Sequence, residues 1–121
     1  MTIKRIPSGG PFETKVGYCR AVVANGMVFV AGTCLQDEEA SDVADQCRSA
    51  LRVIGAALAE AGSGWEKVVR VRYLLPNRED FEACVPLLRE TFGPNPPAAT
   101  MMVCGLLDPA HLIEIEVDAV L

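Results

Sequence analysis

The segment YCRAVVANGMVFVA, from Tyr18 to Ala31, decides the fold more than any other stretch of this chain. Two runs rich in apolar residues flank Asn25-Gly26, and this dipeptide tolerates the positive φ angles that a two-residue type I′ turn requires. The pattern predicts a β-hairpin with strands at residues 18–24 and 27–31. Before the hairpin, residues 2–6 are predicted to form a short edge strand and residues 7–11 a loop.

Two amphipathic helices are predicted after the hairpin. Between Asp42 and Ala61, apolar residues recur at the three-and-four spacing of one buried helix face, and Ser41 is a suitable N-cap. A second helix is predicted from about Arg78 to Phe92, with Asn77 as its cap. Because Pro86 removes a backbone hydrogen bond from a helix interior, we expect either a kink there or a regular helix that begins late.

Three further strands complete the predicted order β-β-α-β-α-β-β, with the short N-terminal edge strand as an optional addition before it. They are residues Val68 to Leu75, Ala98 to Cys104 and His111 to Leu121. The last one alternates, so that its apolar residues face one way and Glu114, Glu116 and Asp118 face the other. This order predicts an α+β fold in which both helices pack on one face of a mixed sheet.

The other face of the sheet is predicted to carry charged and apolar residues together. Its members would be Arg70, Arg72, Leu74, Glu114, Glu116 and Asp118. Such a mixture cannot fill the core of a monomer, but it suits a subunit interface with water-lined clefts. We therefore expect an oligomer.

Composition excludes several classes of protein. The 121 residues, 50% of them hydrophobic and 22% charged, are typical of one globular domain covering residues 1–121. The net charge of −5 and the scattered basic residues argue against a nucleic-acid partner. The apolar runs are too short to span a bilayer and no signal peptide is evident, so we expect a cytoplasmic protein without a membrane partner.

The cysteines and the single histidine limit the chemistry further. Five cysteines without a CxxC spacing predict reduced, mostly buried thiols rather than disulfides. One histidine, His111, cannot supply a multi-histidine metal site, and we assign it a structural role at the start of the last strand. We therefore expect neither a metal nor a cofactor.

An ordered set of motifs covers residues 17–121. Gly17-Tyr18-Cys19-Arg20-Ala21-Val22 is followed by Val30-Ala31-Gly32-Thr33 and by Asp45-Gln46-Cys47-Arg48. Pro97-Ala98 then stands before an interval of fifteen residues, from Ala99 to Glu114, which leads into Ile115-Glu116-Val117. Together they resemble the Rid family, also called YjgF or L-PSP, whose best-known members hydrolyse reactive enamines and imines.

The resemblance implies a homotrimer of chorismate-mutase-like protomers with a ligand cleft between each pair of neighbours. In active members an arginine binds the substrate carboxylate; its position is filled here by Ala99, as in a Rid-like subgroup that lacks it. Glu114 stands at the position of the glutamate that positions the attacking water. The resemblance places Tyr18 on the wall of the cleft and Met101 two residues after the missing arginine.

Other site residues are candidates with open alternatives. Arg20 and Arg72 could replace the missing cation, or they could form interface salt bridges with Glu114 or Glu116. Glu114 itself could belong to a solvated acidic stripe, and Tyr18 could simply pack at the interface. Thr33 and Thr100 are weaker hydroxyl candidates for binding the ligand, and Met101 is expected to form part of its wall.

The sequence therefore supports two readings of function. The first is an imine or enamine hydrolase whose substrate is altered because Ala99 replaces the arginine, with a small molecule bound between subunits. The alternative is a trimer that binds a small metabolite without turnover, or that acts as a regulatory partner.

Overall fold

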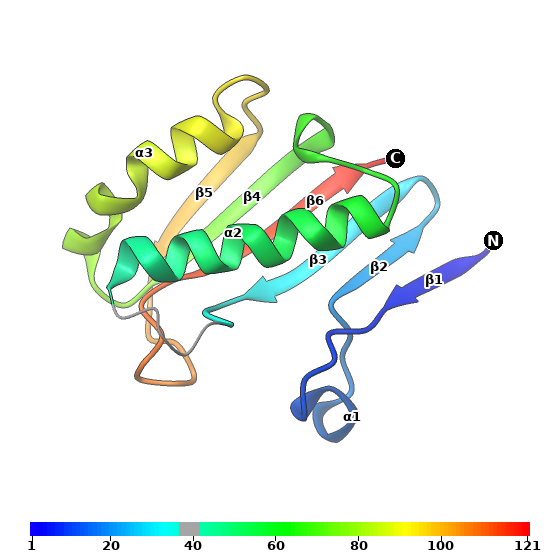
Figure 1. Ribbon diagram of the computed structural model, residues 1–121, viewed down its shortest axis with the longest axis horizontal. Helices are drawn as coiled ribbons and strands as arrows, with labels where there is room; N and C mark the ends of the chain where they lie inside the picture. Colours follow the sequence, from blue (N-terminus) through cyan, green and yellow to red (C-terminus); the bar gives the residue numbers. More distant parts are fainter. Residues whose placement is uncertain (37–41) are drawn as a thin grey trace.

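The computed structural model describes residues 1–36 and 42–121, which form a mixed sheet with two long helices on one face (Figure 1). In chain order, the elements are β1 (Ile3–Ile6), α1 (Phe12–Val16), β2 (Ala21–Ala24), β3 (Met27–Thr33), α2 (Val43–Glu60), β4 (Val68–Leu75), α3 (Phe81–Phe92), β5 (Ala98–Val103) and β6 (Glu114–Val120). The six strands lie in the order β1-β2-β3-β6-β4-β5. Only β4 and β5 pair in parallel; all other neighbouring strands are antiparallel. The predicted α+β fold is confirmed.

The predicted hairpin forms between β2 and β3, with the predicted turn at Asn25-Gly26. Asn25 and Gly26 have φ angles of 50° and 76°, as a type I′ turn requires. The first strand is shorter than predicted, because β2 begins only at Ala21. Tyr18 lies in the connection from α1, a five-residue helix that ends at Gly17 with a φ of 90° and that the sequence reading missed.

Both long helices begin differently from the prediction. The carboxylate of Asp42 accepts a hydrogen bond from the backbone N–H of Asp45 at 2.8 Å, so Asp42 is the observed N-cap of α2; Ser41 lies outside the described residues. Residues Arg78–Asp80 form a 3₁₀ turn, and the α-helical part of α3 starts at Phe81 with Pro86 inside it. The regular helix thus begins three residues later than Arg78, in line with one of the two expected alternatives, although Pro86 still lies inside it.

The last strand alternates as predicted but starts later. Ile115, Val117 and Ala119 are fully buried beneath the helices, while the intervening acidic side chains lie on the opposite face. β6 begins at Glu114 rather than at His111, because His111 belongs to a turn in which its N–H donates to the carbonyl of Asp108 at 3.0 Å. β5 similarly ends at Val103, one residue before the predicted end.

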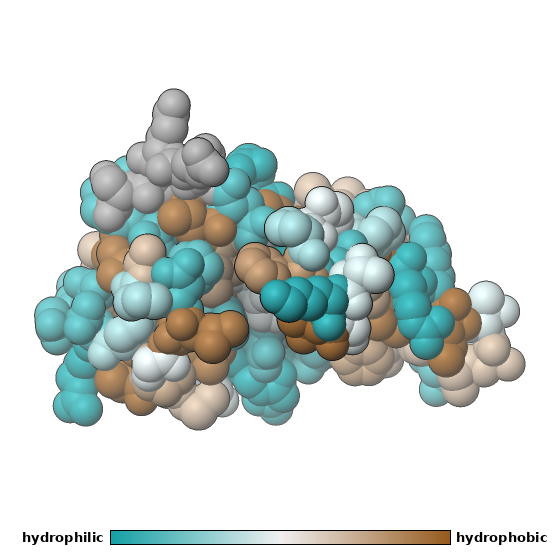
Figure 2. All heavy atoms as spheres, turned by 90° about the horizontal axis from the view of Figure 1, so that it is seen from below, coloured by the Kyte–Doolittle hydropathy of each residue, from teal (hydrophilic) through white to brown (hydrophobic). Residues whose placement is uncertain are grey.

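The core lies between the helices and one face of the sheet. Ile54 and Leu58 of α2 are fully buried there against β6, and Phe92 of α3 meets the ring of Trp65 edge-on at 5.3 Å. On the surface seen from below in Figure 2, hydrophobic residues reach solvent between hydrophilic ones. Phe29 and Met102 are 45% and 44% exposed, so the sheet presents apolar side chains that this chain alone does not cover. Within the two described ranges, none of the helices has the length and apolar character to cross a bilayer.

Candidate functional site

The predicted site residues lie on both faces of the sheet. In the parallel pairing of β4 with β5, Ala99 stands beside Val71, whose side chain is buried under the helices. The next residue along β5, Thr100, stands beside Arg72 on the other face of the sheet, which the helices do not cover and which we call the open face. Glu114 also lies on the open face, because it alternates with the buried Ile115. Within this chain, Ala99 and Glu114 therefore point to opposite sides of the sheet.

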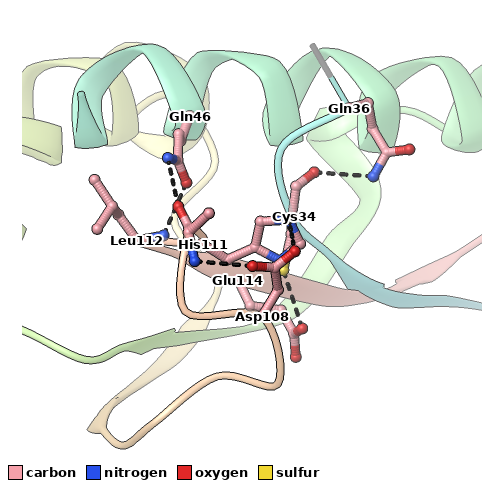
Figure 3. A network of polar contacts seen from close by, with 8 residues as sticks. Cys34, Gln36, Gln46, Asp108, His111, Leu112 and Glu114 are labelled. Atoms are coloured by element: carbon pink, nitrogen blue, oxygen red, sulfur yellow. Dashed lines mark hydrogen bonds and ion pairs between the residues drawn. The ribbon is translucent and has the colours of Figure 1, made fainter. Parts of the chain in front are cut away.

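Glu114 is held tightly at the start of β6. Its carboxylate packs over Gly32 of β3 so closely that a Cβ on Gly32 would lie 2.7 Å from Oε2. The thiol of Cys34 donates a hydrogen bond to Oε1 at 3.2 Å (Figure 3). The side chain remains partly exposed. Glu114 is thus an ordered carboxylate that solvent can reach, and Cys34 is a contact that the sequence reading missed.

The loop before Glu114 is anchored to α2 by one buried side chain. Gln46 donates from Nε2 to the carbonyl of Ala110 at 3.1 Å and accepts the N–H of Leu112 at 2.8 Å (Figure 3). His111 lies between these two anchors, with Nε2 3.9 Å from a carboxylate oxygen of Asp108. The sequence held one signal for this role: Gln46 is a polar residue on the buried face of a predicted helix, and buried polar side chains are normally hydrogen-bonded.

Arg20 and Thr33 bond to each other inside the molecule. The guanidinium of Arg20 is nearly buried and donates to Thr33 Oγ1 at 2.8 Å, and that hydroxyl donates to the carbonyl of Ala31 at 2.8 Å. Arg20 also precedes β2 rather than lying on it as predicted. These contacts use the side chain of Arg20 to brace the end of β3.

Arg72 pairs with Glu116, one of the two partners named for its alternative role, and with Asp118, but both pairs lie within the chain and not across an interface. Its Nη1 lies 3.0 Å from Glu116 Oε1 and 3.6 Å from Asp118 Oδ2. Arg72, Glu116 and Asp118, together with Tyr18, line a groove of about 800 Å³ on the open face of the sheet. Arg72 is therefore turned away from the face on which Ala99 lies.

Ala99 lines a second, smaller and largely apolar groove between α3 and β5. The groove measures about 320 Å³, and Met101, Phe81 and Phe92 contribute to its walls. Arg89 is the one charged residue among those that line it. The methyl group of Ala99 leaves this groove without a cation on the strand.

Two limits on the chemistry follow from the side chains present. No three His, Cys, Asp or Glu side chains gather closely enough to bind a metal ion, as far as the described ranges extend. Burial, followed by the hydrogen bond and the charge of Glu114, raises the pKa of the Cys34 thiol to about 12. At neutral pH this thiol is a hydrogen-bond donor and not a nucleophile.

Comparisons with known proteins agree with this fold. The profile of the Endoribonuclease L-PSP family matches residues 11–121. A RutC family protein of Synechocystis is 32% identical over 100% of this chain and 98% of its own length. The human 2-iminobutanoate/2-iminopropanoate deaminase is 27% identical over 98% of this chain and 90% of its own. A crystal structure of a YjgF/YER057c/UK114 family member from Mycobacterium tuberculosis has a TM-score of 0.92 at 36% identity, covering 99% of this chain and 100% of that one.

Proposed function

Because the chain belongs to the Endoribonuclease L-PSP family, also called the YjgF family, we propose that it hydrolyses imines or enamines in a cleft between subunits. One observation carries the proposal. Of the three acidic residues on the open side of β6, Glu116 and Asp118 share Arg72, whereas no ion pair joins Glu114 to a cation of the described residues. An ordered, unpaired and partly exposed carboxylate is suited to accept a proton from water.

The chemistry needs only a base and a bound imine. Glu114 takes a proton from a water molecule as the water oxygen bonds to the imine carbon. The C=N π electrons move to nitrogen, which takes back the proton from Glu114 to give a carbinolamine. A second proton passes from its hydroxyl group to the nitrogen, the carbon–nitrogen bond breaks as the C=O bond forms, and the products are a carbonyl compound and ammonia. An enamine enters the same route after it tautomerises to the imine. Positioned general bases of this kind contribute roughly 10²–10⁴-fold to the rate.

The position of Ala99 supports a cleft built from two protomers. Ala99 and Glu114 point to opposite sides of one sheet, so a single ligand can touch both only if neighbouring subunits supply them. The uncovered apolar side chains of the open face are consistent with such an assembly. We expect a homotrimer, which sedimentation analysis would report as three times the 13.0 kDa chain mass. A monomer at micromolar concentration would contradict this cleft.

The groove at Ala99 supports a substrate without a carboxylate at that end. A bidentate arginine would contribute about 1.5–3 kcal/mol to binding a carboxylate, and alanine contributes none of it. Arg20 is committed to Thr33, and Arg72 to Glu116 and Asp118. The apolar wall beside Met101 favours an imine or enamine whose non-reacting end is apolar, with the exposed Arg89 of α3 as the one charged residue that lines the groove.

Ammonia release from two freshly generated imines tests this proposal. One imine carries a carboxylate, such as 2-iminopropanoate, and the other carries an alkyl group in its place. We expect the wild-type chain to accelerate hydrolysis of the alkyl imine more than that of the carboxylate imine, and Glu114→Gln to abolish both accelerations. Hydrolysis at the uncatalysed rate for every imine would overturn the proposed activity.

A binding protein without turnover is the second candidate, and the Ala99 groove favours it. The groove is apolar and contains no group that could take part in hydrolysis other than by binding. Calorimetry with a slowly hydrolysed imine analogue separates the two functions. A catalyst loses turnover in Glu114→Gln but retains the analogue, whereas a pure binding protein shows binding and no turnover in either form.

A further inference from the structure

Cys34 follows β3 directly, and its place is set by contacts on both sides. The side-chain amide of Gln36 donates to the Cys34 carbonyl at 3.1 Å, and the backbone N–H of Gln36 donates to Ser49 Oγ of α2 at 3.1 Å. On the other side, Arg20 braces Thr33. The thiol thus reaches Glu114, 80 residues away in the chain, from a backbone that is itself tied to the core.

The surroundings of the thiol keep it protonated. Burial is the largest cause of its raised pKa, followed by the hydrogen bond to Glu114 and the charge of that carboxylate. Asp108 acts in the same direction, and Arg20 opposes them. A protonated thiol beside a carboxylate has one role open to it, which is to donate its hydrogen.

Glu114 is consequently oriented by a neutral donor, unlike its neighbours on β6. An arginine such as Arg72 would orient a carboxylate but would also offset its charge and reduce its basicity. A thiol is a weak, uncharged donor, so it directs one oxygen without placing a cation beside the carboxylate. Gly32 leaves room for the other oxygen, because a Cβ there would lie only 2.7 Å from Oε2.

We infer that Cys34 is a positioning residue for Glu114: its thiol holds Oε1 while Oε2 occupies the space left by the absent side chain of Gly32, and together these set the direction of the basic lone pair. This inference rests on the proposed role of Glu114 as the base. It assigns a function to a half-buried cysteine that touches no substrate itself.

Steady-state kinetics on three variants test the inference. Loss of one hydrogen bond from a weak, neutral donor corresponds to a rate loss of up to about tenfold, so we expect Cys34→Ala to lower kcat by roughly that factor. KM should change by less than about twofold, since the thiol does not contact the ligand. Cys34→Ser should recover most of kcat, because its hydroxyl is also a donor. Cys104→Ala is the matched control, and we expect wild-type kcat from it. A Cys34→Ala enzyme with wild-type kcat would overturn the inference.

The reactivity of the thiol gives a second test that needs no turnover and leaves Cys34 unchanged. Alkylation by iodoacetamide is followed at Cys34 by peptide mass spectrometry in wild type and in Glu114→Gln, with Cys104 as the reference in the same sample. Removing the carboxylate lowers the pKa of Cys34, and each unit of that fall raises the thiolate fraction about tenfold. We therefore expect faster alkylation of Cys34 in the variant.

The two tests separate failure of the inference from failure of the proposed function. A wild-type chain without hydrolytic activity overturns the function, and the alkylation rates then decide whether the thiol holds the carboxylate. Equal alkylation rates in wild type and Glu114→Gln overturn the contact, whatever the activity.

Discussion

The Glu114 end of the sheet and the groove at Ala99 are the two regions that the proposed function joins, and they differ in how they are built. Glu114 is surrounded by specific contacts: Cys34 on one oxygen, Gly32 beneath the other, and a loop anchored by Gln46 before it. Ala99 faces a largely apolar groove whose one charged lining residue is Arg89. If the proposed function holds, the reacting end of the ligand is specified more strictly than its other end.

The largest effect is expected from removing the base. Glu114→Gln keeps the size of the side chain but cannot accept the proton, so hydrolysis should fall by about 10²-fold or more. The comparable change on the same strand, Glu116→Gln, alters a residue that is paired with Arg72. It should lower the rate of hydrolysis by at most about tenfold. Ammonia release measured on both variants checks the difference. Equal losses would show that the acidic face acts as a whole and that Glu114 has no special role.

A smaller loss is expected from crowding Glu114 without removing it. In Gly32→Ala the new Cβ forces the carboxylate to shift, and displacements of about 1 Å can cost up to 10²-fold in rate. The melting temperature should change little, because the atom that must move is the end of a partly exposed side chain. Gly105→Ala is the control, since a Cβ at Gly105 meets nothing within 4 Å. Full activity in Gly32→Ala would show that the orientation of Glu114 is unimportant.

The Ala99 side of the comparison is sharpened by adding a cation. Ala99→Arg restores a carboxylate anchor, and its preference for 2-iminopropanoate over the alkyl imine should rise by about tenfold, the lower end of what a charge-assisted pair supplies. The ratio of kcat/KM values for the two imines measures this change. An unchanged ratio would mean that position 99 does not face the ligand.

The smallest effect is expected at Arg72. Its two ion pairs are about one-third exposed, so Arg72→Met should lower the free energy of unfolding by less than about 1 kcal/mol, and by less still at high salt. Urea denaturation at two salt concentrations measures this. KM for the carboxylate imine should change by less than about threefold, because Arg72 is committed to Glu116 and Asp118. A tenfold rise in KM would instead identify Arg72 as the replacement anchor.

Local features of the fold were predictable and long-range ones were not. The turn at Asn25-Gly26 and the alternation of β6 follow from backbone preferences and side-chain period, which involve only adjacent residues. The short helix α1 escaped prediction because five residues carry too little periodicity to indicate a helix. His111 was placed on the last strand because its turn depends on Asp108 and on the Gln46 clamp, neither of which the alternation reveals.

The candidate site was likewise predictable from the sequence only in part. The resemblance of motifs selected Glu114 and identified Ala99 as the position at which the arginine is missing. It could not tell where the side chains of Arg20 and Arg72 would point. Their partners, Thr33 for one and Glu116 with Asp118 for the other, depend on strand pairing. The contact of Cys34 with Glu114 likewise exists only because β3 and β6 are neighbours in the sheet.

The sequence by itself determined the hairpin, both long helices, the two-sided character of β6 and the family to which the chain belongs. These properties follow from turn residues, from the periodicity of apolar residues and from the order of the motifs. Only the tertiary structure decided that Ala99 and Glu114 lie on opposite faces and that a neutral thiol orients the carboxylate. The physical reason is that strand order and register bring together residues far apart in the chain, and no local preference encodes that choice.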